Sequence, residues 1–108
     1  MAKIKILIVE DELVIAQDIS FILEDLGYEI VDMAIDYDEA IAAIEKESPD
    51  LVLLDIDLND DKDGVDIATY IRANTSLPFL YLTSNADVST VIRAKETHPN
   101  GYVLKPIE

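Results

Sequence analysis

The sequence predicts an α/β fold with one five-stranded parallel sheet and helices on both faces. Short apolar runs recur along the chain, stretches with helical apolar spacing separate them, and polar residues follow most runs. Alternation of this kind produces parallel strands joined by right-handed helical crossovers. For five strands we expect the doubly wound, flavodoxin-like order 2-1-3-4-5, which binds ligands at the carboxyl edge of the sheet.

The expected strands are the apolar runs themselves. Most are nearly continuous, which indicates strands covered on both faces, as in a parallel sheet. The second is weaker because Glu29 and Asp32 interrupt it. In chain order the expected strands are residues 4–9, 28–34, 51–54, 79–82 and 102–104.

Four amphipathic stretches between these runs predict the helices. In the first, apolar residues recur at helical spacing from Leu13 to Leu26, and Gly27 follows where a helix C-cap is expected. The last has the least regular pattern. The expected helices are residues 12–26, 37–46, 65–73 and 87–96.

Composition sets limits on function. A chain of 108 residues is expected to form one domain over residues 1–108. Its formal net charge of −15 disfavours direct nucleic acid binding and suits a divalent cation, a basic partner or simple solubility. Without cysteines there is no disulfide scaffold or thiolate metal site, and a reducing cytoplasm fits. The N-terminal apolar run is too short to span a membrane.

Polar residues capable of chemistry follow four of the expected strands. Because parallel strands end at the same edge, these side chains should converge there. Carboxylates brought together repel one another unless one is protonated or a cation intervenes, and Mg²⁺ prefers such oxygen ligands. Each residue alone is more often a helix cap, a solvated turn or a surface residue, but the joint occurrence at four strand ends favours a site. The set comprises Glu10, Asp11, Asp55, Asp57, Thr83 and Lys105.

The chemistry suited to this set is phosphoryl transfer, in which catalysis is mostly positioning and charge neutralisation. Asp55 would attack phosphorus and form an aspartyl phosphate. A metal would screen the carboxylate, and Lys105 and the Thr83 hydroxyl would contact phosphoryl oxygens.

Four blocks carry a family resemblance. ILIVEDE at 6–12, PDLVLLD at 49–55, LTS at 82–84 and GYVLKP at 101–106 resemble the signature blocks of response regulator receiver domains, over about residues 3–106. This implies a two-component signalling switch rather than an enzyme with turnover. A sensor histidine kinase or phosphotransfer protein would phosphorylate it, and an effector domain could follow in the chain.

The resemblance assigns a role to each position. It implies that Asp55 is the phosphoacceptor, that Glu10 and Asp11 hold Mg²⁺, and that Asp57 contributes a backbone carbonyl to the metal. It makes Thr83 the switch hydroxyl, Lys105 the phosphate-pairing lysine and Tyr102 the aromatic that turns inward on activation. A cis Lys105–Pro106 bond is implied as well. The site implied by the resemblance comprises Glu10, Asp11, Asp55, Asp57, Thr83, Tyr102 and Lys105.

Three features depart from the common family pattern. Asp57 is acidic where neutral residues are frequent, and residues 59–64 (NDDKDG) replace a shorter turn. The sequence also stops before the fifth helix of the family, so one sheet face would lie partly bare. We expect a truncated chain, with a homodimer across that face as the less favoured alternative.

The NDDKDG segment also resembles the start of a calcium-binding EF-hand loop, but the closing position holds Tyr70 instead of glutamate, so a solvated turn is the better interpretation. The single histidine, His98, lies in a loop pattern and is interpreted as a surface residue.

Two other functions compete. A haloacid-dehalogenase-type phosphatase also uses an aspartyl nucleophile, and its Asp-x-Asp block is similar to Asp55-Ile56-Asp57. However, that block usually opens the chain, and there is no room here for a cap domain. A receiver-like module that is never phosphorylated would usually have lost a key residue, whereas this sequence retains them all.

Overall fold

Strands and helices alternate along the whole chain. A computed structural model describes residues 3–58, 61–83 and 88–105, without the side chains of 88–91. Each predicted element is present, and the bounds differ from the prediction by at most one residue at either end. In chain order the elements are β1 (Lys5–Val9), α1 (Leu13–Asp25), β2 (Glu29–Ala34), α2 (Tyr37–Glu47), β3 (Leu51–Asp55), α3 (Gly64–Asn74), β4 (Phe79–Thr83), α4 (Val88–Glu96) and β5 (Gly101–Leu104).

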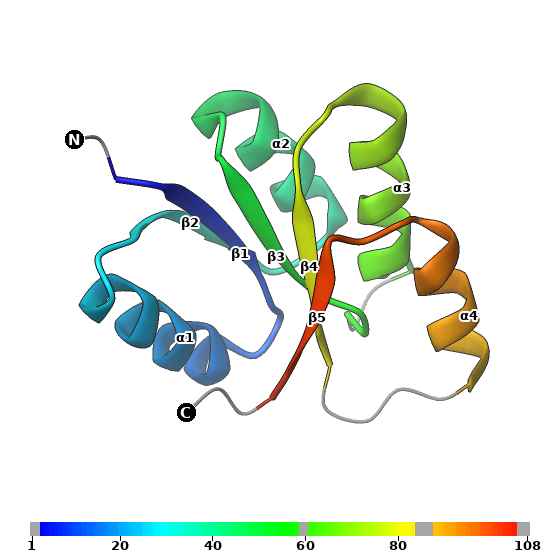
Figure 1. Ribbon diagram of the computed structural model, residues 1–108, viewed down its shortest axis with the longest axis horizontal. Coiled ribbons are helices and arrows are strands. Elements are labelled where there is room, and N and C mark those ends of the chain that lie inside the picture. The colour runs from blue at the N-terminus through cyan, green and yellow to red at the C-terminus, as the bar shows by residue number, and fades with distance from the viewer. Residues whose placement is uncertain (1–2, 59–60, 84–87, 106–108) are drawn as a thin grey trace.

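The five strands form one parallel sheet in the order β2-β1-β3-β4-β5, as predicted. α1 covers one face, whereas α2, α3 and α4 cover the other (Figure 1). β1 pairs with β2 on one side and with β3 on the other. Because β1 and β3 are parallel neighbours, their carboxyl ends lie next to each other. In Figure 1 this carboxyl edge of the sheet lies at the bottom.

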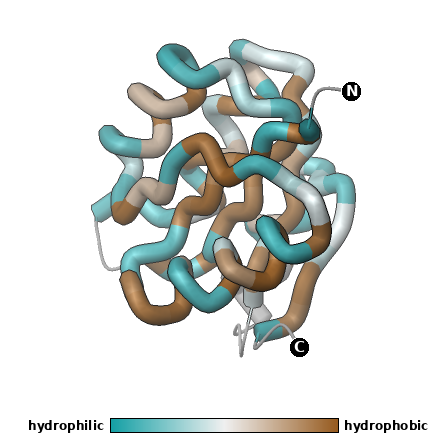
Figure 2. The backbone as a smooth tube through the Cα atoms, turned by 90° about the vertical axis from the view of Figure 1, so that its left-hand side faces the viewer, coloured by the Kyte–Doolittle hydropathy of each residue, from teal (hydrophilic) through white to brown (hydrophobic). Residues whose placement is uncertain are grey.

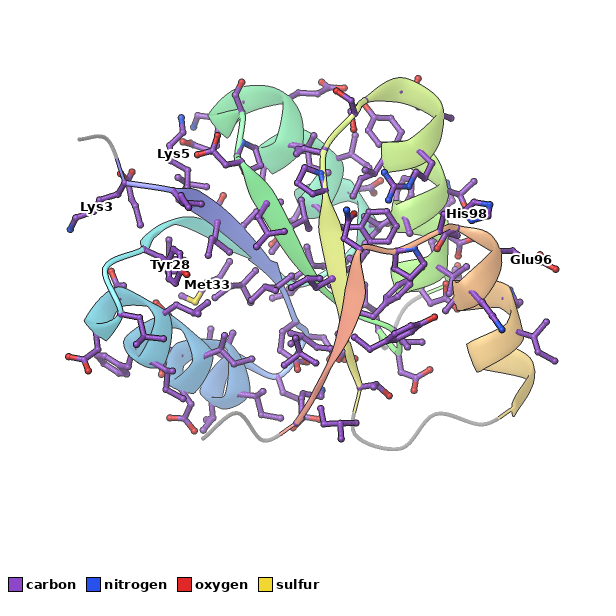
Figure 3. All side chains as sticks on the ribbon, in the orientation of Figure 1. Lys3, Lys5, Tyr28, Met33, Glu96 and His98 are labelled. Carbon is purple, nitrogen blue, oxygen red and sulfur yellow. The ribbon has the colours of Figure 1, made fainter. Side chains whose placement is uncertain are left out.

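The core consists of two apolar layers, one on each face of the sheet. β1 contributes to both, and its residues Leu7, Ile8 and Val9 are completely buried. Figure 2 shows hydrophobic segments running through the middle of the molecule, with hydrophilic segments mostly around them. Under α1, the partly buried Tyr28 and Met33 extend the smaller layer at the β2 side (Figure 3). Burial on both faces explains why β1, β3 and β4 are continuous apolar runs, whereas the edge strands β2 and β5 are only partly buried.

Local sequence signals set the helix ends. The Asp36 side chain caps α2 by accepting a hydrogen bond from the Glu39 N–H at 2.9 Å. Asp63 caps α3 in a reciprocal capping box with Asp66. Gly27 follows the C-cap of α1 with a φ of 99°, a left-handed conformation that glycine adopts without strain, which confirms its predicted role.

The connection between α4 and β5 is fastened to α3 by Arg72. Its guanidinium donates to the Thr97 carbonyl at 3.0 Å and to Asn100 Oδ1 at 3.0 Å, and it lies over the Phe79 ring. His98 lies in this turn with a φ of 53° and an exposed side chain, as predicted for a surface residue (Figure 3). These bonds fix where β5 begins.

No helix within residues 3–58, 61–83 and 88–105 is long and apolar enough to cross a membrane.

Candidate functional site

Three carboxylates meet at the carboxyl edge, as the topology predicts. Glu10 and Asp11 directly follow β1, and Asp55 ends β3. One oxygen from each lies within 4.8 Å of the others. Glu10 is 1% exposed and Asp55 5% exposed, whereas Asp11 is half-buried. Such a group is costly without a proton or a cation, because like charges repel strongly away from water.

Lys105 supplies a cation from the residue after β5. Its Nζ lies 2.8 Å from Glu10 Oε1 and 3.3 Å from Asp55 Oδ2, so one ammonium bridges two carboxyl groups. The Lys105 N–H also donates to the Thr83 carbonyl at 2.9 Å, which aligns the end of β5 with the end of β4. Residues from the first, third and fifth strands therefore share one site.

The shared environment divides the protons unequally between the two buried carboxyls. Burial, together with the hydrogen bond and charge of Glu10, raises the pKa of Asp55 to about 7. Burial also acts to raise the pKa of Glu10, but hydrogen bonds with Asp55, Lys105 and the Glu12 N–H outweigh it and lower that pKa. Below about pH 7 and without a metal, Asp55 therefore holds the proton and Glu10 the charge.

Lys105 stays charged in this setting. Burial would lower the pKa of its ammonium group, but the hydrogen bond to Glu10 and the charge of Asp55 raise the pKa instead. The site thus has a fixed positive group beside an ionisable carboxyl.

Gly64 makes the approach of α3 to Asp55 possible. A Cβ atom at this position would lie 1.9 Å from the Asp55 carbonyl oxygen, so no side chain fits without a backbone shift. The Gly64 N–H also donates to the Ile56 carbonyl at 3.0 Å. Nothing in the sequence around Gly64, beyond its place in the EF-hand-like segment, signals this long-range contact.

The remaining predicted site residues lie at the margin of the cluster. Asp57 donates its backbone N–H to Asp55 Oδ1 at 3.2 Å, whereas its side chain is exposed and outside the three-carboxylate group. A metal contact through its carbonyl stays a prediction. Thr83 ends β4 and is half-buried beside the end of β5. The predicted cis bond to Pro106 lies outside the described residues.

Tyr102 faces outward and is 47% exposed. It is the register partner of Tyr81 on β4, and the two rings stack with centroids 5.8 Å apart. Tyr81 is fully buried, and its hydroxyl is hydrogen-bonded to Thr97 Oγ1 at 2.7 Å. Sequence reasoning did not single out Tyr81, because within β4 it is one apolar residue among several.

The EF-hand-like segment has another use in its described part. Asp63 caps α3 and pairs with Arg93 of α4 at 2.9 Å, and Gly64 begins the helix. Asn59 and Asp60 lie outside the described residues. Helix capping accounts for Asp63 without a bound calcium ion.

The donor set at the carboxyl edge fits Mg²⁺. Three carboxylates offer hard oxygen atoms close together, and two of them are buried beside a single ammonium group. Glu10, Asp11 and Asp55 are the residues that would hold the ion.

Comparison with known families gives a consistent match. A family model described as the response regulator receiver domain matches residues 6–108. The transcriptional regulatory protein PdtaR of Mycobacterium tuberculosis is 36% identical over 102 residues, which cover 94% of this chain and 49% of that protein. The probable transcriptional regulator ycf27 of Cyanophora paradoxa is 36% identical over 104 residues, 96% of this chain and 43% of that protein. The chain thus spans about half the length of these relatives, or less.

Similar solved structures are also described as receiver domains. The signal receiver domain of a modulated diguanylate cyclase from Desulfovibrio desulfuricans superposes with a TM-score of 0.92 at 36% identity, over 99% of this chain and 85% of that one. The receiver domain of NtrX from Brucella abortus gives a TM-score of 0.85 at 32% identity, over 95% of this chain and 87% of that one.

Proposed function

The chain belongs to the family of response regulator receiver domains of two-component systems, and on that premise we propose that Asp55 accepts a phosphoryl group in a Mg²⁺-dependent reaction. The observation that carries this proposal is the bridging contact of Lys105 with Glu10 and Asp55 at the carboxyl edge of the sheet. It places an ammonium group against two buried carboxyls from distant parts of the chain, and one of these carboxyls belongs to the proposed nucleophile.

Asp55 is the nucleophile in the proposed reaction. Its ionised Oδ atom forms a bond to phosphorus while the bond from phosphorus to the donor's histidine nitrogen breaks, and the imidazole leaves with that electron pair. A bound Mg²⁺ would neutralise charge on the carboxylates and the phosphoryl oxygens. Asp55 must be ionised to hold the metal or to attack phosphorus, and with a pKa of about 7 it is partly ionised near neutral pH even before a metal binds. Lys105 then turns from the carboxylate pair to a phosphoryl oxygen.

The output is a conformational change at the β4 and β5 side of the sheet. The Thr83 hydroxyl would move toward the phosphoryl group, and Tyr102 would leave its exposed position against Tyr81 and turn inward. The phosphoryl group can shift this equilibrium only if it binds the active arrangement more tightly than the inactive one.

The partners follow from the same proposal. The phosphoryl donor is a phosphohistidine on a sensor histidine kinase or a phosphotransfer protein. Because the curated relatives are about twice as long and are named as transcriptional regulators, an effector domain joined to this one would carry any nucleic acid contact. The strongly acidic domain itself would repel nucleic acid.

The test is labelling by acetyl phosphate in the presence of Mg²⁺, followed by intact-protein mass spectrometry. The parent protein should gain one base-labile phosphoryl group, and the gain should require the metal. Asp55→Asn should gain none, because an amide cannot form the acyl phosphate. Labelling of that variant at the parent rate would remove the assignment.

Asp57→Asn is the matched control, because this neighbouring acid has an exposed side chain outside the carboxylate group. It should still be labelled once. Steady Mg²⁺-dependent turnover of a small phosphate ester by the parent protein would instead favour a phosphatase of the haloacid dehalogenase type, whereas receivers react at a single site and stop.

A further inference from the structure

A groove runs across the surface between α2 and α3, on the face opposite α1. It consists of two hollows of about 330 Å³ and 210 Å³ that share the residues Tyr37 and Lys62. Tyr37 begins α2, and Lys62 precedes α3. Because both residues line both hollows, their side chains lie between the two. We call the two hollows together the α2–α3 groove.

A cation already lies against an aromatic ring in this groove. Lys62 Nζ lies 4.2 Å from the centroid of the Tyr37 ring, which is the geometry of a cation–π contact. Lys62 is otherwise exposed, so its ammonium can leave the ring at little cost. A second ring, that of Tyr70, lines the larger hollow, and its hydroxyl donates to Glu45 Oε1 at 2.9 Å. The groove therefore has two aromatic walls.

The charge of the groove favours a further cation. Asp38 and Asp61 line the smaller hollow. Asp66 lines the larger one, but it also pairs with Arg93 at 3.7 Å, so the smaller hollow contributes most of the negative charge. Within the described lining, Lys62 is the single cationic residue. The whole chain carries −15, so its field also draws positive groups toward the surface.

From these contacts we propose that the α2–α3 groove binds an arginine side chain in a basic segment of a partner protein, and that Lys62 is an internal stand-in which this arginine displaces from the Tyr37 ring. Arginine fits better than lysine, because its planar guanidinium stacks on tyrosine and still has donors left for carboxylates. The larger hollow exceeds one guanidinium group and leaves room for neighbouring residues of the segment.

The test is a calorimetric titration with acetylated Gly-Arg-Gly-Arg-Gly amide on the parent protein, Lys62→Ala and Lys46→Ala. Both variants lose one positive charge, but only Lys62 lies on the Tyr37 ring. Lys46, exposed in the last turn of α2, is the charge-matched control. Lys62→Ala should bind the peptide about twofold to fivefold more tightly than Lys46→Ala, the factor expected for an exposed cation–π contact.

A second pair of variants tests the ring. Tyr37→Leu should weaken binding by about twofold to fivefold, whereas Tyr37→Phe should bind as the parent does, because phenylalanine keeps the aromatic face. Amide NMR spectra should place the peptide-induced shifts around Tyr37 and Tyr70. Equal affinities of Lys62→Ala and Lys46→Ala, no loss in Tyr37→Leu, or shifts confined to the carboxyl-edge cluster would each overturn the proposal in favour of diffuse charge attraction.

Discussion

The proton between Asp55 and Glu10 links the chemistry of the site to the stability of the protein. In the folded, metal-free protein Asp55 has a pKa of about 7, against 3.8 for an ordinary aspartate. The folded protein therefore holds a proton that the unfolded chain has released between about pH 4 and 7. In that window the free energy of unfolding falls as the pH rises, because the folded state binds more protons than the unfolded state.

We expect Asp55→Asn to remove most of this pH dependence. An asparagine side chain does not ionise in this range, so its contribution to the free energy of unfolding does not fall as the pH rises. Between about pH 5 and pH 8, the free energy of unfolding of the variant should therefore increase by about 2 to 4 kcal/mol relative to that of the parent. The lowered pKa of Glu10 has the opposite effect on the pH dependence of stability. The expected difference in the free energy of unfolding is therefore smaller than the Asp55 shift alone would give. Urea unfolding in the presence of a chelator measures the difference, and parallel curves for the two proteins would contradict it.

The convergence of Glu10, Asp55 and Lys105 could be predicted from the sequence, because strand ends in a parallel sheet meet at one edge. The surroundings of these residues could not be predicted. The outward position of Asp57 and the stacking of Tyr102 on Tyr81 could not, since both depend on side-chain directions that are fixed only when distant strands pack.

Among the elements, α3 has the closest connection to the site. Its first residue, Gly64, touches the Asp55 backbone, and its N-cap, Asp63, pairs with Arg93 of α4. An exposed ion pair of this kind contributes little to stability, but it joins the N-cap of α3 to α4. The start of α3 is therefore in contact with both the proposed reaction site and a neighbouring helix.

Gly64→Ala should damage the site as well as the fold. The added methyl group cannot fit against the Asp55 carbonyl, so α3 or the end of β3 must move, at a cost of about 1 to 3 kcal/mol. Labelling by acetyl phosphate should slow because the Asp55 carboxyl is displaced. Thermal unfolding and the labelling rate are the measurements.

Gly27→Ala provides the control for that change. It is the same substitution in a left-handed position with open space around it, so it should cost about 1 kcal/mol through backbone strain. Its labelling rate should equal that of the parent. If both variants lose labelling in proportion to their stability, Gly64 has no special role at the site.

The elements themselves were almost fully predictable from the sequence. Buried strands are apolar on both faces and read as continuous apolar runs, whereas the helices are apolar on one face and repeat about every 3.6 residues. The two patterns are therefore easily distinguished. The contacts of Arg72 and Arg93 were not predictable, because both join segments more than twenty residues apart through exposed side chains. The sequence around each arginine does not indicate which residue it contacts.

Over the whole molecule, negative charge dominates. A formal charge of −15 on a small domain is a source of self-repulsion that any salt will screen. General screening must therefore be separated from a specific effect of Mg²⁺ on the three carboxylates.

Mg²⁺ should stabilise the parent protein even in about 0.5 M NaCl, where surface charges are largely screened. Binding to the folded state alone adds about 2.7 kcal/mol when free Mg²⁺ is about 100 times the Kd. Asp11→Asn should lose most of this gain, and Asp18→Asn, which removes an exposed acid on α1, should keep it. The measurement is thermal unfolding of each protein with and without Mg²⁺. An equal Mg²⁺-dependent increase in stability in both variants would indicate diffuse screening.

The bond between Lys105 and Glu10 joins residues 95 positions apart. A ribosome must therefore deliver nearly all of this domain before the two buried carboxyls acquire their ammonium partner. A nascent chain that has not yet reached Lys105 has β1 and β3 but lacks this ammonium partner for its acidic edge. Under the proposed function, full reactivity toward a phosphodonor is therefore expected only after β5 and Lys105 have been added.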